Sequence, residues 1–324
     1  MTALGGGTAS GIVSTNGNAS GAGAGSYSAA EAAARASGQD SAATGQFATV
    51  QGAGGTAYGA WSSVTGDNGT AIGYSAVAGA GSVALGYANQ ATGGQSVAIG
   101  YANVVTGNNS GAIGDPNMVV GSNSYAIGNN NYIAADNAFV LGNRAAIAAG
   151  SNGAVVVGNA GSVTAANGVA IGSGASANAA NSVALGSGSV ANEANTVSVG
   201  SAGNERRVTN VAPGVNGTDA VNLDQLNAGV ASTLGAANAY TNTQIANLNR
   251  NLSFGIAGAT ALTMIPEIAP GQKFSVGMGV ADFNGYSAVA LGFSGRVNEH
   301  VNVKAGASIS NGRSTYGGGV SFGF

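Results

Sequence analysis

The hydrophobic pattern of this chain is a short motif in which branched aliphatic residues alternate with alanine before a glycine. It reads SVALGY at Ser82–Tyr87, SVAIGY at Ser96–Tyr101 and SVALGS at Ser182–Ser187. Its glycine returns about every 14 residues, at Gly73, Gly86, Gly100, Gly114, Gly128, Gly142, Gly158, Gly172, Gly186 and Gly200. A low-complexity linker would not keep such a register, so the spacing indicates an ordered repeat protein.

A second series of glycines falls halfway between the first, at Gly66, Gly79, Gly93, Gly107 and Gly121. At about 3.3 Å per residue, one repeat supplies two short strands and two tight turns. We therefore predict a β-solenoid over residues 59–203, with one coil per repeat. Pairs such as Val83 and Leu85 point to one face of their strand, and we expect this aliphatic stripe to be the core.

Residues 1–58 keep the glycine spacing but lack the aliphatic pairs. They are interpreted as degenerate repeats or a cap, with a short helical insertion at Ala29–Ala36.

After Gly200 the repeat gives way to a transition segment, residues 204–227, which contains Arg206, Arg207 and Pro213. Thr218 and Asp219 offer a helix N-cap, and helix-forming residues then continue for about 40 positions. Residues 228–265 are predicted to form a short coiled coil that continues into the C-terminal region. Its apolar seam is thin, so the helix needs partners along its length: Leu223, Leu226, Val230, Thr241, Ile245, Leu248 and Leu252.

In residues 266–324 the apolar period changes to two, as in Phe274, Val276, Met278 and Val280. Four strands of about ten residues follow one another, joined by polar turns, and that length lets a tilted strand cross a bilayer. A soluble half-buried sheet is the alternative, but it would rarely carry so much glycine and alanine on its polar face. We predict four strands of a membrane β-barrel.

Four strands cannot close a barrel, and lipid does not tolerate an open sheet edge. Three copies would supply twelve strands, whereas two would make a barrel already filled by side chains. The small residues on the inward face of the strands leave room for a helix in the barrel lumen. We expect the end of the preceding helix to fill it, and this helix has small residues of its own: Gly255, Ala257, Gly258, Ala259 and Ala261.

The amino-acid composition limits the kinds of functional site that this chain can contain. The chain has 58 glycines, no cysteine, one histidine and a net charge of −3. Disulfides and thiolate metal sites are thereby excluded, and no cofactor or nucleic-acid partner is expected. The few charged residues of the repeats, such as Asp67, Arg144 and Glu193, stand at non-equivalent positions, so we expect no enzyme. The repeats also lack the regular aspartates of calcium-binding rolls and the threonine face of ice-binding solenoids.

The first residues, MTALGGGTAS, lack the charged and apolar regions of a secretory signal, so we expect any export signal to lie outside this sequence. No run of about 20 apolar residues occurs either.

Taken together, these segments resemble the YadA-like trimeric autotransporter adhesins. The repeats are similar to the family's left-handed β-roll head, Arg206–Leu226 to its neck, and Lys273–Phe324 to its membrane anchor. The resemblance implies a homotrimer in the bacterial outer membrane, whose twelve-stranded barrel contacts lipid, exports the head and displays it on the cell surface. It also implies that the terminal Phe324 is read by the barrel-assembly machinery.

Heads of this family bind extracellular matrix, so the resemblance implies a ligand such as collagen, fibronectin or laminin. The segment NSVALGSGS, from Asn181 to Ser189, approaches a collagen-associated pattern, with Asn181, Ser187 and Ser189 as the outward contact residues. Core packing alone explains its aliphatic residues Val183 and Leu185, and we favour that interpretation of the segment over ligand contact. The alternative function is a non-adhesive structural role in self-association or surface shielding.

Overall fold

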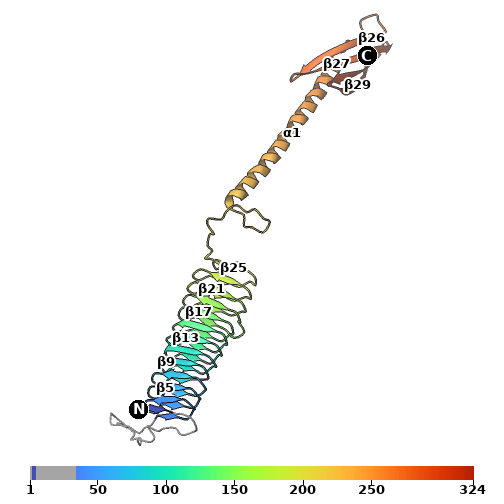
Figure 1. Ribbon diagram of the computed structural model, residues 1–324. Coiled ribbons are helices and arrows are strands. Elements are labelled where there is room, and N and C mark those ends of the chain that lie inside the picture. The colour runs from blue at the N-terminus through green and yellow to red at the C-terminus, as the bar shows by residue number, and fades with distance from the viewer. Residues whose placement is uncertain (1, 5–33) are drawn as a thin grey trace. The chain divides into compact units, whose positions relative to one another are not determined.

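The computed structural model describes residues 2–4 and 34–324 (Figure 1). The chain divides into two compact units between Arg207 and Val208. The first is a solenoid of short strands, and the second contains one long helix and a four-stranded sheet. Each unit is described by itself below.

The solenoid consists of two sheets that share every coil. All their strand pairs are parallel except β1 with β3, which is antiparallel. The first sheet contains β1 (Thr2–Leu4), β3 (Ala42–Thr44), β5 (Thr56–Tyr58), β7 (Thr70–Ile72), β9 (Val83–Tyr87), β11 (Val97–Tyr101), β13 (Gly111–Gly114), β15 (Tyr125–Gly128), β17 (Phe139–Leu141), β19 (Val155–Val157), β21 (Val169–Ile171), β23 (Val183–Leu185) and β25 (Val197–Ser198). The second contains β2 (Arg35–Ala36), β4 (Thr49–Val50), β6 (Ser63–Val64), β8 (Val77–Ala78), β10 (Gln90–Ala91), β12 (Val104–Val105), β14 (Met118–Val119), β16 (Tyr132–Ile133), β18 (Ala146–Ile147), β20 (Ser162–Val163), β22 (Ser176–Ala177) and β24 (Val190–Ala191).

The coils stack in register because equivalent residues pair from one coil to the next, as Ile99 does with Ile113. The motif glycine is needed for both conformation and space. Gly100 has φ of 123°, and a Cβ there would lie 2.1 Å from the carbonyl oxygen of Gly114. The longer repeat after Gly142 keeps the register, since Phe139 still pairs with Val155 and the extra residues lie in the turn after β18.

The interior of the solenoid corrects one prediction. Ala84, Ala98 and Ala184 are fully buried, whereas Leu85 and Leu185 of the predicted core stripe are exposed. The interior is filled by these alanines and by valine or isoleucine from the second sheet, such as Val105 and Ile133. The reason is the narrowness of the coil, whose facing short strands leave room mainly for small and medium side chains.

Two ladders of buried polar side chains run through the middle coils, and the sequence reasoning missed both. Asn89, Asn103, Asn117 and Asn131 bond to one another from coil to coil, with Nδ2–Oδ1 distances of 2.8–3.0 Å. Ser82, Ser96, Ser110 and Ser124 form a second ladder, in which each Oγ donates to a backbone carbonyl and accepts a backbone N–H. Because these groups are paired, the ladders cost little to bury and hold the coils in register.

Coils are already present within the segment interpreted as degenerate repeats or a cap. From Ala34 onward the chain already forms coils, with Thr44 paired to Tyr58 and Thr49 to Ser63. Within the predicted helical insertion, Arg35–Ala36 is strand β2, and residues 29–33 lie outside the described part of the chain.

The helix α1 (Leu223–Thr263) has 41 residues, which agrees with the predicted length, but it begins later than the predicted cap. Asn222 is the N-cap and forms a capping box with Gln225. Asp219, a predicted cap residue, instead accepts the backbone N–H groups of Val215 and Asn216 in the preceding turn. The last residues of the predicted transition segment therefore belong to the helix.

The C-terminal sheet confirms the predicted four-stranded meander. Its order is β26 (Phe274–Phe283), β27 (Tyr286–Asn298), β28 (Val301–Ser310) and β29 (Arg313–Phe322), all antiparallel. Among the described residues, its edge strands β26 and β29 each lack a neighbour on one side.

Candidate functional site

The first sheet of the solenoid presents a continuous aliphatic stripe on its outer face. Large aliphatic side chains are exposed there in most coils: Ile72, Leu85, Ile113, Ile127, Leu141, Ile171 and Leu185. Ile99 and Val157 hold the same position in the two remaining coils, where they are half-buried. The stripe is uncharged and contiguous over many coils. A soluble protein rarely leaves such a surface open, which is typical of an interface.

The three predicted ligand-contact residues do not share one environment. Asn181 is exposed in a turn with φ of 56°, and its amide donates to Asn195 Oδ1 at 3.1 Å. Ser187 is also exposed, and its hydroxyl donates to the carbonyl of Ser173. Ser189 is fully buried, so its predicted outward orientation is wrong. Its position in the coil is that of the buried Asn89 and Asn103, which face the interior.

Arg206 forms hydrogen bonds with the last coils of the solenoid. Its guanidinium donates to Ser189 Oγ at 2.8 Å and to the carbonyl of Val199 at 2.7 Å, and it also bonds the carbonyl of Ser187. A planar guanidinium can bond several acceptors at once, and each such charged bond is stronger than a neutral one. Arg206 thus ties the segment after the repeats to the solenoid end.

We expect Arg206→Ala to loosen the final coils by about 1–3 kcal/mol, because Ser189 and the two carbonyls lose their charged donor. Hydrogen exchange of residues 183–203 measures this as a loss of protection. Arg207→Ala is the matched control, since Arg207 is exposed and has no hydrogen bond among the described residues. Equal protection in the two variants would contradict the role of Arg206.

The end of α1 packs closely on the C-terminal sheet because glycines on the facing strands lack side chains. A Cβ on Gly279 would lie 2.1 Å from the carbonyl oxygen of Ala261. On Gly292 and Gly306 it would lie 2.5 and 2.7 Å from Ile265 Cδ1. The small inward residues predicted from the alternation thus face the helix, as expected.

The small residues of the helix divide between two faces. Ala257, Gly258 and Ala261 are buried against the sheet, whereas Gly255 and Ala259 are exposed. Small residues on both faces allow close approach of the sheet on one side and of a further backbone on the other.

Phe254 begins the packed end of the helix. Its ring meets that of Tyr286 edge to face, with 4.7 Å between centroids. The guanidinium of Arg313 lies over the same ring at 5.9 Å. These contacts fix the level at which the helix enters the sheet.

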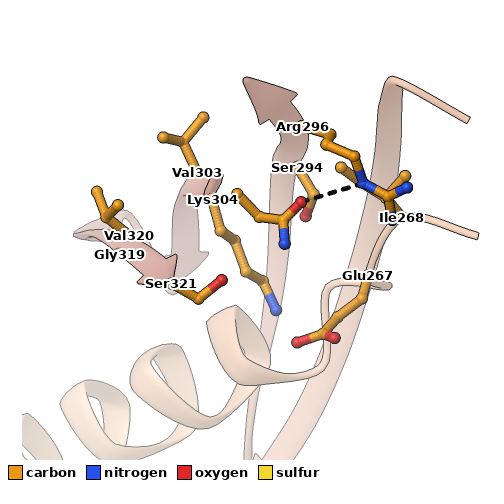
Figure 2. Close-up of a pocket in the computed structure, with 10 residues that line it drawn as sticks. Glu267, Ile268, Ser294, Arg296, Val303, Lys304, Gly319, Val320 and Ser321 are labelled. Carbon is orange, nitrogen blue, oxygen red and sulfur yellow. Dashed lines mark hydrogen bonds between the residues drawn. The ribbon is translucent and has the colours of Figure 1, made fainter. Parts of the chain in front are cut away.

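A polar cavity of about 300 Å³ lies where the helix ends (Figure 2). Lys304 Nζ donates to the carbonyl of Ile265 at 2.8 Å, just beyond the helix C-terminus. A cation there satisfies a carbonyl and complements the helix dipole. Figure 2 also shows Glu267 beside this cavity and the hydrogen bond from Arg296 to Asn302.

Two carboxyl groups have lowered pKa values, both outside the sheet. The backbone N–H of Gly203 lowers the pKa of Glu205. The N–H groups of Asn216 and Val215 lower the pKa of Asp219. Both groups stabilise turns and are fully exposed, so neither has the environment of a catalytic acid.

Within residues 34–324, no cluster of three or more His, Cys, Asp or Glu side chains could bind a metal ion. None of the described helices has both the length and the hydropathy to span a membrane. Phe324, the predicted assembly terminus, is fully exposed beyond β29.

Three family descriptions match successive segments of the chain. Residues 266–324 match the YadA-like membrane anchor domain, and residues 207–249 match the coiled stalk of trimeric autotransporter adhesin. The YadA head domain repeat matches overlapping segments across 51–115 and 164–202.

Curated relatives agree with these matches. The chain is 30% identical over 140 residues to the autotransporter adhesin BtaE of Brucella suis biovar 1, covering 36% of this chain and 19% of that protein. It is 38% identical over 96 residues to EhaG of Escherichia coli O157:H7, covering 27% and 6%. It is 32% identical over 119 residues to NhhA of Neisseria meningitidis serogroup B, covering 36% and 19%. The alignments thus span less than a fifth of the length of each of these relatives.

One solved structure, the collagen-binding domain of the Yersinia adhesin YadA, is 27% identical and covers 56% of this chain and 85% of its own, with a TM-score of 0.31. Head, stalk and anchor matches follow one another along more than half of the sequence. The chain therefore belongs to the YadA-like trimeric autotransporter adhesins.

Proposed function

We propose that three copies of this chain form an outer-membrane anchor that exports the solenoid head and displays it on the bacterial surface. The observation that carries this proposal is the two-sided C-terminal sheet. One face is lined by glycine and alanine against the helix, and the other exposes large apolar side chains such as Met278, Leu291 and Phe322. Apolar residues pointing outward and small ones inward suit strands between lipid and a filled lumen.

Trimer formation is supported at three levels of the chain. The aliphatic stripe of the solenoid is exposed, and so is the helix seam, including Leu226, Val230, Leu248 and Leu252. The edge strands β26 and β29 have one side each without a partner strand in the described part of the chain, which could pair with other copies. Pairing β29 of one chain with β26 of the next would give twelve strands and remove every open edge.

The proposed role of the head is adhesion to a host surface or to extracellular matrix such as collagen, fibronectin or laminin, without catalysis. Asn181 and Ser187 remain proposed contact residues because both are exposed near the C-terminal end of the head. Barrel-assembly machinery and outer-membrane lipid are the proposed partners of Phe324 and of the outer face of the sheet.

The test uses the purified full-length trimer on immobilised collagen, fibronectin and laminin. Saturable binding to at least one of them is expected. If none binds while cells that display the protein still clump, the adhesive role is wrong and the alternative, structural self-association or shielding, is correct.

A further inference from the structure

Five successive coils of the head each carry one aromatic side chain where a strand of the first sheet ends, either in the turn that follows it or, for Tyr87 and Tyr101, as the last residue of β9 and β11. We call Phe47, Trp61, Tyr74, Tyr87 and Tyr101 the aromatic row. The hydrogen bonds that join these turns follow one pattern, since Ser75 N–H donates to the Ala60 carbonyl and Ala88 N–H to the Tyr74 carbonyl. With about 4.8 Å per coil, the row spans about 19 Å along the solenoid.

The aromatic rings of neighbouring coils stack on one another in two groups. Phe47 stacks on Trp61 with 4.1 Å between centroids. Tyr74, Tyr87 and Tyr101 stack in turn at 5.3 and 5.0 Å, with their planes within 11° of parallel. The rings are therefore ordered before any ligand arrives, and little conformational entropy remains to be lost on binding.

About half of the surface of Trp61 and of each tyrosine is open to solvent, with Tyr101 51% exposed and Trp61 46%, whereas Phe47 is more buried. The two stacks are offset at one step. The position equivalent to Tyr74 in the preceding coil is Ala60, and the position equivalent to Trp61 in the following coil is Ser75. Neither small residue has a ring that could continue a stack. One face of the Trp61 ring and one face of the Tyr74 ring are therefore not covered by another ring of the row.

The fold does not require these rings. The positions equivalent to Tyr87 in later coils hold Asp115, Asn129 and Asn143, and those coils keep the same strand register. The position equivalent to Trp61 holds Asn130, which has a similar φ of 58°. The aromatic residues therefore need a reason other than coil geometry.

Two of the rings are present at an energetic cost. Phe47 and Trp61 have φ values of 58° and 63°, in the left-handed region that bulky residues avoid. The turn imposes this conformation in the next coils as well, where Ser75 and Ala88 have φ of 55° and 53°. It costs about 1–2 kcal/mol for a residue other than asparagine or glycine. Stacking offsets part of it, but asparagine or glycine would avoid it.

The surroundings define the chemistry of the partner. Between Ser41 and Gly114 the only charged residue is Asp67, which lies in a turn at the opposite edge of the coil and accepts the Ala53 N–H. Asp115 takes the position equivalent to Tyr101 in the next coil, so the one charge at the end of the row is negative. The row itself offers ring surfaces, three phenol hydroxyls and one indole N–H, and the exposed amide of Gln46 adjoins it. Aromatic faces beside neutral hydrogen-bonding groups match a pyranose ring, which has apolar C–H faces and a rim of hydroxyls.

We propose that the aromatic row is a binding site for a neutral oligosaccharide. A sugar ring stacks at the step between Trp61 and Tyr74, and further units follow the tyrosines. Anionic glycans are disfavoured, since the row has no cation to pair with them. This proposal names a ligand class for the head and rests on its surface display, but it is tested on the purified protein and does not depend on matrix binding.

The test is binding of the full-length trimer to an array of neutral oligosaccharides of glucose, galactose, mannose and N-acetylhexosamines, with sialylated and sulfated glycans beside them. Trp61 is the only tryptophan in the chain, so its fluorescence reports directly on the row. We expect saturable binding to a neutral glycan together with a change in Trp61 emission.

Matched variants use residues that the same turn already holds in other coils. Trp61→Asn and Tyr87→Asn should each weaken binding roughly two- to tenfold, in line with the loss of one aromatic contact. Tyr132→Ser is the control, because Tyr132 is exposed on the second sheet and its equivalent in a later coil is Ser162. Trimer mass should be unchanged in all three, and none should unfold at a lower temperature, because asparagine at position 61 also relieves the strain of the left-handed backbone.

Any of four results would overturn the proposal. They are no binding to any neutral glycan, equal binding by the Asn variants, preference for charged glycans, or dissociation of the trimer in the Asn variants, which would make the row a subunit contact. Row-dependent binding of a proline-rich triple-helical peptide in place of glycans would assign the site to another ligand class.

Discussion

Replacing Gly279 with alanine is expected to abolish the stable trimer. The added Cβ would lie 2.1 Å from the carbonyl oxygen of Ala261 and 3.1 Å from the backbone nitrogen of Ile265. Both atoms belong to main chain at the helix end and cannot rotate away, so the helix must move off the sheet. Such overpacking costs about 1–3 kcal/mol per chain, and the proposed barrel contains the change three times.

The measurement is heat-modifiable electrophoresis of outer-membrane fractions, with surface display of the head as a second readout. The control is Gly318→Ala, since a Cβ at Gly318 meets its nearest atom at an ordinary 3.5 Å. Gly318→Ala should remain trimeric and displayed. A heat-stable trimer of normal abundance in Gly279→Ala would refute the close packing of helix and sheet.

Replacing Ile113 with aspartate is expected to separate the three heads while each solenoid stays folded. Ile113 is 46% exposed on the aliphatic stripe, so one chain by itself tolerates a charge there. In the proposed trimer the stripe is covered, and each chain would bury an unpaired carboxylate. The cost is several kcal/mol for each buried charge.

Met118→Asp is the matched control, because Met118 is 44% exposed in the same coil but on the second sheet. It should change stability by less than about 0.5 kcal/mol, as surface substitutions usually do. Thermal unfolding of the purified full-length protein and crosslinking between heads distinguish the variants. Equal behaviour of the two would show that the stripe is not the subunit interface.

Several features of this protein could be predicted from its sequence because they depend on period and length. The return of a glycine every 14 residues defines a coil, and four alternating segments separated by polar turns define a meander. The helix length followed from the long interval without proline. The small residues on one face of the C-terminal strands also indicated close helix packing, because glycine and alanine leave space for another backbone.

The tertiary structure decided which face of a repeating pattern lies inside. Alternation placed Val83 and Leu85 on one face, but alternation is the same whichever face is buried. The narrow coil admits Ala84 and excludes Leu85, so the larger side chains lie outside. The same geometry buries Ser189, which the sequence placed outside.

Contacts between coils were also beyond the sequence reasoning. The asparagine ladder and the aromatic row exist because residues far apart in sequence come to lie one coil apart. The helix start depended on a similar choice, since Asn222, rather than Thr218, has its partner Gln225 in place. The amino-acid sequence alone thus determined the repeat period and the lengths of the elements. The direction of each side chain and its neighbours in adjacent coils were decided by the tertiary structure, because the interior of each coil is too narrow for large side chains.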